Sequence, residues 1–182
     1  MQIKRPMDSL VIMNELVLPN DTNTLNNLMG GRLLHWMDIA AAMSAGKFAK
    51  STCVTAAVDK VSFNHPIRLG DVVTIQAKCV RSFNTSMEVH IEVWAQDIKT
   101  DNKVKSNEAF YTFVALNQEG QPIPVPHIEP LSEEEKILYD YALLRKQLKL
   151  LMAGKTNLDK VPELKAQFDR WASGEEKHFV AI

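Results

Sequence analysis

The chain contains 182 residues, of which 46% are hydrophobic, and its formal net charge is −1. This length allows one well-buried domain with an appendage, and the near-neutral charge provides no field that would attract nucleic acid or an anionic membrane. No apolar run approaches the roughly 20 residues of a membrane span, and the first six residues lack the apolar core of a secretory signal, so we expect a cytoplasmic protein without membrane or nucleic-acid partners.

A largely buried helix is predicted from about residue 31 to residue 50. Its apolar residues recur three and four positions apart, as on the core-facing side of a helix: Leu33, Leu34, Met37, Ala41, Ser44, Ala45 and Phe48. Asp38 falls within this apolar surface, although acids are seldom buried without a partner because desolvating a carboxylate is unfavourable. Asp38 is therefore either a member of a structural ion pair or a reactive group, and its surroundings favour the reactive group.

Two glycines, Gly30 and Gly31, stand at the predicted start of this helix. The first N–H groups of a helix have no internal acceptor, and the helix dipole gives them a partial positive charge. Because glycine has no β-carbon, a carbonyl oxygen can approach these N–H groups and be stabilised there as an oxyanion during acyl transfer. The alternative is a flexible entry turn. Asn23 in the preceding loop and Asp38 downstream favour the oxyanion site.

Four strand-like segments follow the helix, at residues 51–63, 72–81, 87–95 and 104–116. The second and third alternate between apolar and polar side chains, which is typical of strands with one buried face. The two cysteines lie in apolar segments of this region and are interpreted as reduced core residues rather than as a disulfide. One helix followed by consecutive antiparallel strands predicts an α+β fold in which a sheet wraps around the helix.

The composition changes after residue 116. Four prolines and a glycine make residues 117–130 an extended linker. Ser132 and Glu135 have the spacing of a capping box, and the apolar pattern that follows predicts one helix and then a second, shorter helix. We therefore expect a domain at residues 1–128 and a helical C-terminal extension at residues 129–182, which packs on the domain or on a neighbouring subunit.

The order of the motifs is informative. Pro-x-Asp-Thr-Asn at residues 19–23 is followed by Gly-Gly at 30–31 and Met-Asp at 37–38. Four further segments continue the series: residues 57–63, 66–71, 85–89 and 113–116. This series resembles the hotdog-fold acyl-CoA thioesterases. The resemblance implies the hotdog fold, an antiparallel sheet around a long central helix, with an early strand near residues 8–18.

The resemblance also implies an activity, the hydrolysis of fatty acyl-CoA to a free fatty acid and coenzyme A, without a cofactor or a metal. It implies a site between two protomers, with Asp38 from one and Asn23 with the Gly31 N–H from the other. A homodimer is then the minimal active unit, and many relatives are trimers of dimers. Asp38 acts either as a general base towards water or as a nucleophile that forms an anhydride. Asn27 is the alternative to Asn23, and Asn23 itself has a turn-forming role as its alternative.

Coenzyme A binding requires cations near the phosphates. The cationic candidates are Lys60, Arg68, Arg81 and Lys105, and Ser86 near a strand turn is a further candidate. The acyl chain is expected along the helix, among Trp36, Met37 and Met43, residues that are equally typical of a core. His35 and Asp38 have no third metal ligand nearby in the sequence.

Two other functions are compatible with such a fold. One is a non-catalytic protein that binds acyl-CoA as a sensor or regulator. The other is a different acyl-transfer or dehydration enzyme, although the His-x-x-x-Pro-Val-Met-Pro-Gly stretch of hotdog dehydratases is absent. The intact set of Asn23, Gly30, Gly31 and Asp38 favours the hydrolase.

Overall fold

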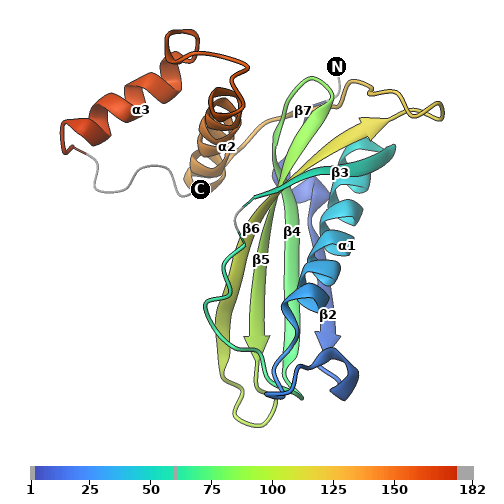
Figure 1. Ribbon diagram of the computed structural model, residues 1–182. Helices are drawn as coiled ribbons and strands as arrows, with labels where there is room; N and C mark the ends of the chain where they lie inside the picture. Colours follow the sequence, from blue (N-terminus) through green and yellow to red (C-terminus); the bar gives the residue numbers. More distant parts are fainter. Residues whose placement is uncertain (1–2, 60, 176–182) are drawn as a thin grey trace. The chain divides into compact units, whose positions relative to one another are not determined.

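The computed structural model describes residues 3–59 and 61–175. The chain divides into two compact units, Met1–Pro130 and Leu131–Ile182. The first unit contains the strands and helix α1, whereas the second is helical (Figure 1).

The first unit is built on a five-stranded antiparallel sheet with the order β2-β4-β5-β6-β3. Its strands are β2 (Val11–Leu16), β3 (Thr52–Asp59), β4 (Val72–Ser82), β5 (Ser86–Gln96) and β6 (Lys103–Leu116). The three long strands β4, β5 and β6 are consecutive in the chain and pair as hairpins, as antiparallel strands with short connections can. β2 and β3 therefore form the two edges of the sheet.

Helix α1 (Gly30–Ala49) lies against one face of this sheet (Figure 1). The core combines fully buried side chains of α1 with alternate residues of the three long strands, and includes Met37, Ala41, Phe48, Ile75, Ala77, Val89, Ile91, Val93 and Phe113. The helical and the alternating periodicities thus both mark core positions correctly, and the predicted hotdog fold is confirmed. Of the residues considered for the acyl chain, Trp36 and Met37 are buried in this core, whereas Met43 is 54% exposed.

The N-terminal region differs from the predicted early strand at residues 8–18. A 3₁₀ turn, η1 (Pro6–Ser9), precedes β2, because Pro6 fixes the first φ angle and the Asp8 carboxylate accepts a hydrogen bond from the backbone N–H of Arg5 at 2.8 Å. Before this turn, β1 (Ile3–Lys4) pairs in parallel with β7 (His127–Ile128). Since Ile128 is fully buried, the end of the predicted linker belongs to the core of the first unit.

Lys4 connects β1 to the end of α1. Its buried ammonium group donates a hydrogen bond to the carbonyl of Phe48, in the last turn of the helix, and lies 5.5 Å from the centre of the Phe48 ring. Burial lowers the pKa of Lys4 from its ordinary value. The bond nonetheless satisfies a carbonyl at the negative end of the helix dipole.

We expect Lys4→Met to lower the free energy of unfolding by about 1–3 kcal/mol, the usual range for a hydrogen bond that involves a charged group. Urea unfolding followed by circular dichroism measures the difference. Lys99→Met, in an exposed turn, removes the same charge and serves as the control. Unfolding curves of Lys4→Met that superimpose on those of Lys99→Met contradict the stabilising role of Lys4.

The second unit contains α2 (Glu133–Met152), the 3₁₀ turn η3 (Leu158–Lys160) and α3 (Pro162–Ala172). α2 begins with the predicted capping box, in which the Ser132 hydroxyl accepts a hydrogen bond from the N–H of Glu135 at 3.1 Å. The two helices share a small apolar core formed by Leu144, Leu148, Val161 and Leu164, with Tyr141, Leu151, Leu158 and Phe168 around it. The predicted C-terminal helices are therefore present.

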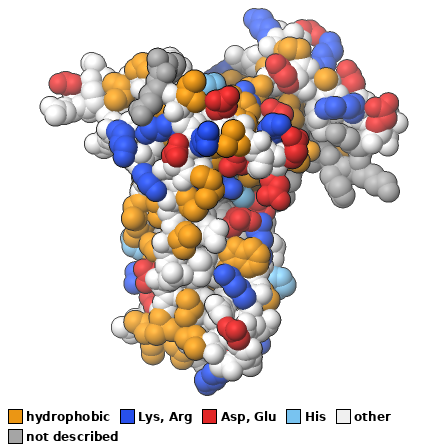
Figure 2. All heavy atoms as spheres, turned by 180° about the vertical axis from the view of Figure 1, so that it is seen from behind, with side chains coloured by type: hydrophobic (Ala, Val, Ile, Leu, Met, Phe, Trp, Pro, Cys, Tyr) orange, Lys and Arg blue, Asp and Glu red, His pale blue; other side chains and the backbone are white. Residues whose placement is uncertain are grey.

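Two surface properties agree with the composition. No helix in the described part of the chain combines the length and the hydropathy that crossing a bilayer requires. On the face shown in Figure 2, acidic and basic side chains are interspersed, so this face carries no extended patch of a single sign.

Candidate active site

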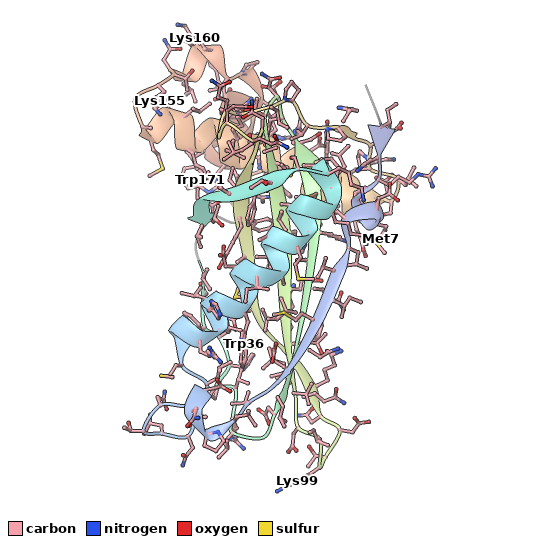
Figure 3. All side chains as sticks on the ribbon, turned by 90° about the vertical axis from the view of Figure 1, so that its right-hand side faces the viewer. Met7, Trp36, Lys99, Lys155, Lys160 and Trp171 are labelled. Carbon is pink, nitrogen blue, oxygen red and sulfur yellow. The ribbon has the colours of Figure 1, made fainter. Side chains whose placement is uncertain are left out.

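Asp38 lies in the third turn of α1, two residues after Trp36, which Figure 3 labels. Its side chain is half-buried and stands at the edge of the core-facing stripe rather than in its middle, since Met37 is fully buried and Ile39 is 39% exposed. The Asp38 Oδ1 atom accepts a hydrogen bond of 2.7 Å from the Thr55 hydroxyl. Among the residues that the structure describes, no lysine or arginine forms an ion pair with Asp38. The structural ion-pair alternative therefore finds no partner within one chain.

Two hydroxyl side chains near Asp38 were not identified from the sequence. Thr55 stands on β3 where the register with β6 shifts, between Thr55 and Ala57, and such irregularities re-aim side chains. Tyr111 on β6 is 1% exposed, and burial together with the negative charge of Asp38 raises its pKa to about 12. Thr55 shares its strand with Thr52, and Tyr111 shares its strand with Ser106 and Thr112, so the sequence offers no signal that singles out these two hydroxyls.

The two glycines at the start of α1 have different surroundings. A β-carbon on Gly30 would lie 3.1 Å from the ring of Phe63, whereas one on Gly31 would meet nothing within 4 Å. The N–H groups of Arg32 and Leu33 both donate to the carbonyl of Met29 at 3.0 Å. Within residues 3–59 and 61–175, the N–H groups of Gly30 and Gly31 have no acceptor. Gly31 thus offers the open approach that the sequence predicts for both, and Gly30 makes room for Phe63.

Asp21 fixes the loop that precedes α1. It is buried, its Oδ1 accepts from Arg32 Nε at 2.8 Å, and its Oδ2 accepts from the N–H of Leu18 at 3.0 Å. Its carbonyl also accepts the N–H of Met29 at 2.9 Å. Asp21 thereby ties both ends of the loop to the first turn of the helix, a role that the motif at residues 19–23 did not reveal.

Asn23 forms an Asx turn at the exposed tip of this loop. Its Oδ1 accepts hydrogen bonds from the N–H groups of Leu25 at 2.9 Å and Asn27 at 3.2 Å. The turn-forming role considered from the sequence is thus present in the structure. Because the two backbone bonds engage the Oδ1 atom, the Nδ2 group is the part of the side chain that is left to act on a ligand.

The structure brings some of the predicted residues together and separates others. Asn23, Gly30 and Gly31 belong to the N-terminal end of α1, and Asp38 lies about 12 Å further along the helix axis at 1.5 Å per residue. No hydrogen bond joins Asn23 to Asp38 in the described part of a single chain. One protomer therefore does not assemble all four residues into one site.

A cleft of about 420 Å³ adjoins the start of α1. It is lined by Asn27, Leu28, Gly30, Leu33, Phe63, His65, Pro66, Ile67 and Asn107. Backbone bonds hold its two sides together, since the N–H of Leu28 donates to the carbonyl of Ile67 at 2.8 Å and that of Leu69 to Asn26 at 3.0 Å. This mainly apolar cleft lies next to the free helix amides and has the dimensions of a small-ligand site.

The candidates for coenzyme A binding that the structure describes do not gather in one place. Arg68 is exposed, pairs with Asn27 in an isolated bridge and lines a smaller cleft of about 250 Å³ beside the first one. Arg81, at the far end of β4, lies over the Phe83 ring at 5.7 Å, and Ser86 begins β5 at the same end. Since β4 has 11 residues, its ends are about 30 Å apart at roughly 3.3 Å per residue. Lys60 lies outside the described residues.

One group of described residues has the spacing of metal ligands, namely His90, Glu92 and Glu108. Lys105 already lies among them, with its ammonium 2.6 Å from Glu92 Oε1 and 3.1 Å from Glu108 Oε2. The hydrogen bond from His90, followed by that from Lys105, lowers the pKa of Glu108 to about 2 against the opposing effect of burial. The carboxylates of Glu92 and Glu108 are therefore already engaged by Lys105 and His90, and the group forms a charge network among side chains.

Residues 25–101 match the family described as Thioesterase superfamily. Acyl-coenzyme A thioesterase 11 of Mus musculus is 41% identical over 143 residues, which are 79% of this chain but only 24% of that longer protein. The uncharacterized acyl-CoA thioester hydrolase YkhA of Bacillus subtilis is 36% identical over 138 residues, covering 76% of this chain and 80% of its own length.

The solved structures that resemble this chain also include acyl-CoA thioesterases and acyl-CoA hydrolases. An apo-hexameric acyl-CoA thioesterase has a TM-score of 0.82 and 38% identity, covering 84% of this chain and 98% of its own. An acyl-CoA hydrolase from Staphylococcus aureus, in complex with butyryl coenzyme A, coenzyme A and coenzyme A disulfide, has a TM-score of 0.77 and 32% identity, with coverages of 84% and 95%. Variants of that hydrolase carry alanine in place of an asparagine, an aspartate and a threonine. The spacing of those three positions equals that of Asn23, Asp38 and Thr55.

Proposed function

Because this chain belongs to the thioesterase superfamily and to its hotdog-fold acyl-CoA thioesterases, we propose that it hydrolyses fatty acyl-CoA to a fatty acid and free coenzyme A. The observation that carries this proposal is the pair formed by Asp38 and Thr55, a carboxylate held by a hydroxyl donor at 2.7 Å and left without a cation in the described chain. Such a carboxylate is fixed in position yet keeps its second oxygen for a reacting group.

The proposed reaction uses few groups. The thioester carbonyl oxygen binds the free N–H of Gly31, where the helix dipole stabilises the developing oxyanion. Asp38 takes a proton from a water molecule, the water oxygen bonds to the carbonyl carbon, and the carbon–sulfur bond breaks to release the thiolate. The nucleophilic route, in which Asp38 forms an anhydride that water then opens, uses the same groups. Neither route requires a cofactor or a metal, because a thiolate is a good leaving group.

The site is completed by a second protomer in this proposal. The outer edge of β3 has no strand partner in the described chain, and apolar side chains are exposed around it: Val54 and Val58 on β3, Ile39 and Met43 on α1. A twofold contact through β3 and α1 would bury them and would bring Asn23 and Gly31 of one protomer to Asp38 of the other. A homodimer is then the minimal unit. Three dimers would give the hexameric state named for one solved relative.

The two clefts near the start of α1 suit the two parts of the substrate. The larger, mainly apolar cleft beside Gly30 and Phe63 suits the acyl or pantetheine chain, and exposed Arg68 in the adjoining cleft suits a phosphate. Arg81 and Ser86, at the other end of the sheet, contribute to coenzyme A binding only if a neighbouring subunit brings them to this region. Cys53 and Cys79 are free thiols, which fits the cytoplasm as the place of action.

A thiol-release assay over acyl-CoA chain lengths tests the proposed function. We expect the purified full-length protein to release free coenzyme A with turnover, because the groups that hydrolysis needs are all present on the chain. A protein that binds acyl-CoA in calorimetry but releases no thiol at any chain length would instead be the sensor considered from the sequence. Product analysis by mass spectrometry separates hydrolysis from dehydration.

A further inference from the structure

The connection between β3 and β4 forms one wall of the larger cleft beside α1. Four of its residues line that cleft, namely Phe63, His65, Pro66 and Ile67. Within the described residues, the segment 61–65 forms no hydrogen bond between backbone groups, in contrast to Ile67, whose carbonyl accepts from the N–H of Leu28 at 2.8 Å. The position of this part of the wall therefore depends on side-chain contacts.

Two buried polar residues of β6 supply those contacts. The Asn107 Nδ2 group donates a hydrogen bond to the carbonyl of Ser62, and Asn107 itself lines the cleft. The Ser106 hydroxyl donates to Asn107 Oδ1 at 2.6 Å and lies 3.2 Å from the carbonyl oxygen of His65. Both residues are 1% exposed, so their side chains are satisfied by this segment and by each other rather than by bulk water.

A β-bulge directs both side chains to this segment. Val93 of β5 pairs with Asn107 and Trp94 pairs with Lys105, so Ser106 is the extra residue on β6. A bulge interrupts the regular ladder and re-aims side chains, and bulges are frequent beside active sites. Both consecutive residues are thereby buried, whereas a regular strand would turn one of them to the opposite face.

The wall reaches the start of α1 through Phe63. Its ring is so close to Gly30 that a β-carbon there would lie 3.1 Å from it. Phe63 directly follows Ser62, whose carbonyl Asn107 holds, and Gly31 with its free N–H comes next on the helix. The bond from Asn107 is therefore one residue away from the ring that borders the proposed oxyanion site.

We propose that Ser106 and Asn107 are positioning residues for the thioester substrate, because they hold the wall of the cleft along which a chain of the substrate lies. This inference rests on the proposed function and adds to it two residues that touch no reacting atom. The chain extends from the thioester as the acyl or the pantetheine chain, since both contain methylene groups that an apolar cleft can bury. A displaced wall weakens binding of the substrate and of the transition state alike, which raises KM and leaves kcat unchanged.

Asn107→Leu tests this role, because it removes both polar groups and keeps a side chain of similar size in the cleft wall. We expect KM for acyl-CoA in a thiol-release assay to rise by about tenfold, with kcat within about twofold of the parent value. Ser106→Ala removes only the hydroxyl donor and should raise KM by a smaller factor. Asn14→Leu, which replaces an exposed asparagine on β2, is the matched control and should retain the parent KM.

Shortened substrates separate positioning of the substrate from a loss of folded protein. A long-chain acyl thioester of N-acetylcysteamine lacks most of the pantetheine chain and the nucleotide, whereas a short-chain acyl-CoA lacks only the long acyl chain. The effect of Asn107→Leu on kcat/KM should disappear with one of these two substrates, and the part that this substrate lacks is the chain that the wall holds. A loss of folded protein instead lowers the rate with every substrate by the same factor and leaves KM unchanged.

Two results overturn the inference: a parent KM in both Asn107→Leu and Ser106→Ala, or an equal loss of kcat/KM with the complete substrate and with both shortened ones. If Asn107→Leu does not fold, Ser106→Ala carries the same comparison. A parent protein that releases no thiol overturns the proposed function and this inference with it. An active parent whose two variants both retain the parent KM overturns the positioning role alone.

Discussion

Replacement of Asp38 by alanine is expected to lower kcat for thioester hydrolysis by about a hundredfold or more, the usual range for removal of a general base. The loss follows from the geometry of the site. Asp38 is the only acid in α1, and Thr55 leaves one of its oxygens available to a water molecule. The measurement is steady-state thiol release at saturating acyl-CoA. KM should change little, because the carboxylate acts on water rather than on the acyl chain.

Asp38→Asn separates the charge of this residue from its shape. An asparagine oxygen can still accept the hydrogen bond from Thr55, but an amide takes no proton from water, so the same loss of rate is expected. Glu119→Ala removes an acid from an exposed turn and should retain parent activity. A near-parent rate in either Asp38 variant would refute the assignment. A single turnover in water labelled with heavy oxygen tests for the anhydride route, since label enters the Asp38 carboxylate only when an anhydride forms and water attacks its aspartyl carbonyl carbon.

Periodic patterns account for the part of the fold that the sequence predicts. The helix at residues 30–49 and the strands β4 and β5 bury the side chains that the three-four and the two-residue spacings select. The pairing of β1 with β7 was not predicted, because two-residue strands show no period and their partners are more than 120 positions apart. In the sequence, β7 shows only as the apolar residue Ile128 within a proline-rich stretch.

The residues of the candidate site likewise fall into two groups, those that the sequence reveals and those that only the fold reveals. Asp38 and the glycines are recognisable because an acid in an apolar helix and a glycine pair at its start conflict with simple packing rules. Thr55 and Tyr111 conflict with nothing in a strand, so their approach to Asp38 emerges only from the pairing of β3 with β6. The separate roles of Gly30 and Gly31 depend on Phe63, which the fold brings to one of them and not to the other.

A mixture of two inactive variants is expected to recover activity if the site is shared between protomers. In a dimer that contains one Asp38→Ala chain and one Asn23→Ala chain, one site combines the intact Asp38 of the second chain with the intact Asn23 of the first. Random pairing of equal amounts makes half of the dimers mixed, each with one intact site, so about a quarter of the parent activity should return. The two proteins are refolded together and thiol release is compared with that of each variant refolded alone.

The converse mixture excludes a trivial explanation such as improved folding. When parent chains are refolded with an equal amount of the Asp38→Ala, Asn23→Ala double variant, every mixed dimer lacks an intact pair, so only parent homodimers remain active. A shared site then retains about a quarter of the activity, whereas a site within one chain retains about half. The roughly 12 Å that separates Gly30 from Asp38 along α1 favours the shared site. The opposite result is that the first mixture shows only the average activity of its two variants and the second retains half of the parent activity. In that case Asn23 and Asp38 act within one protomer, and the exposed edge of β3 does not form the shared site.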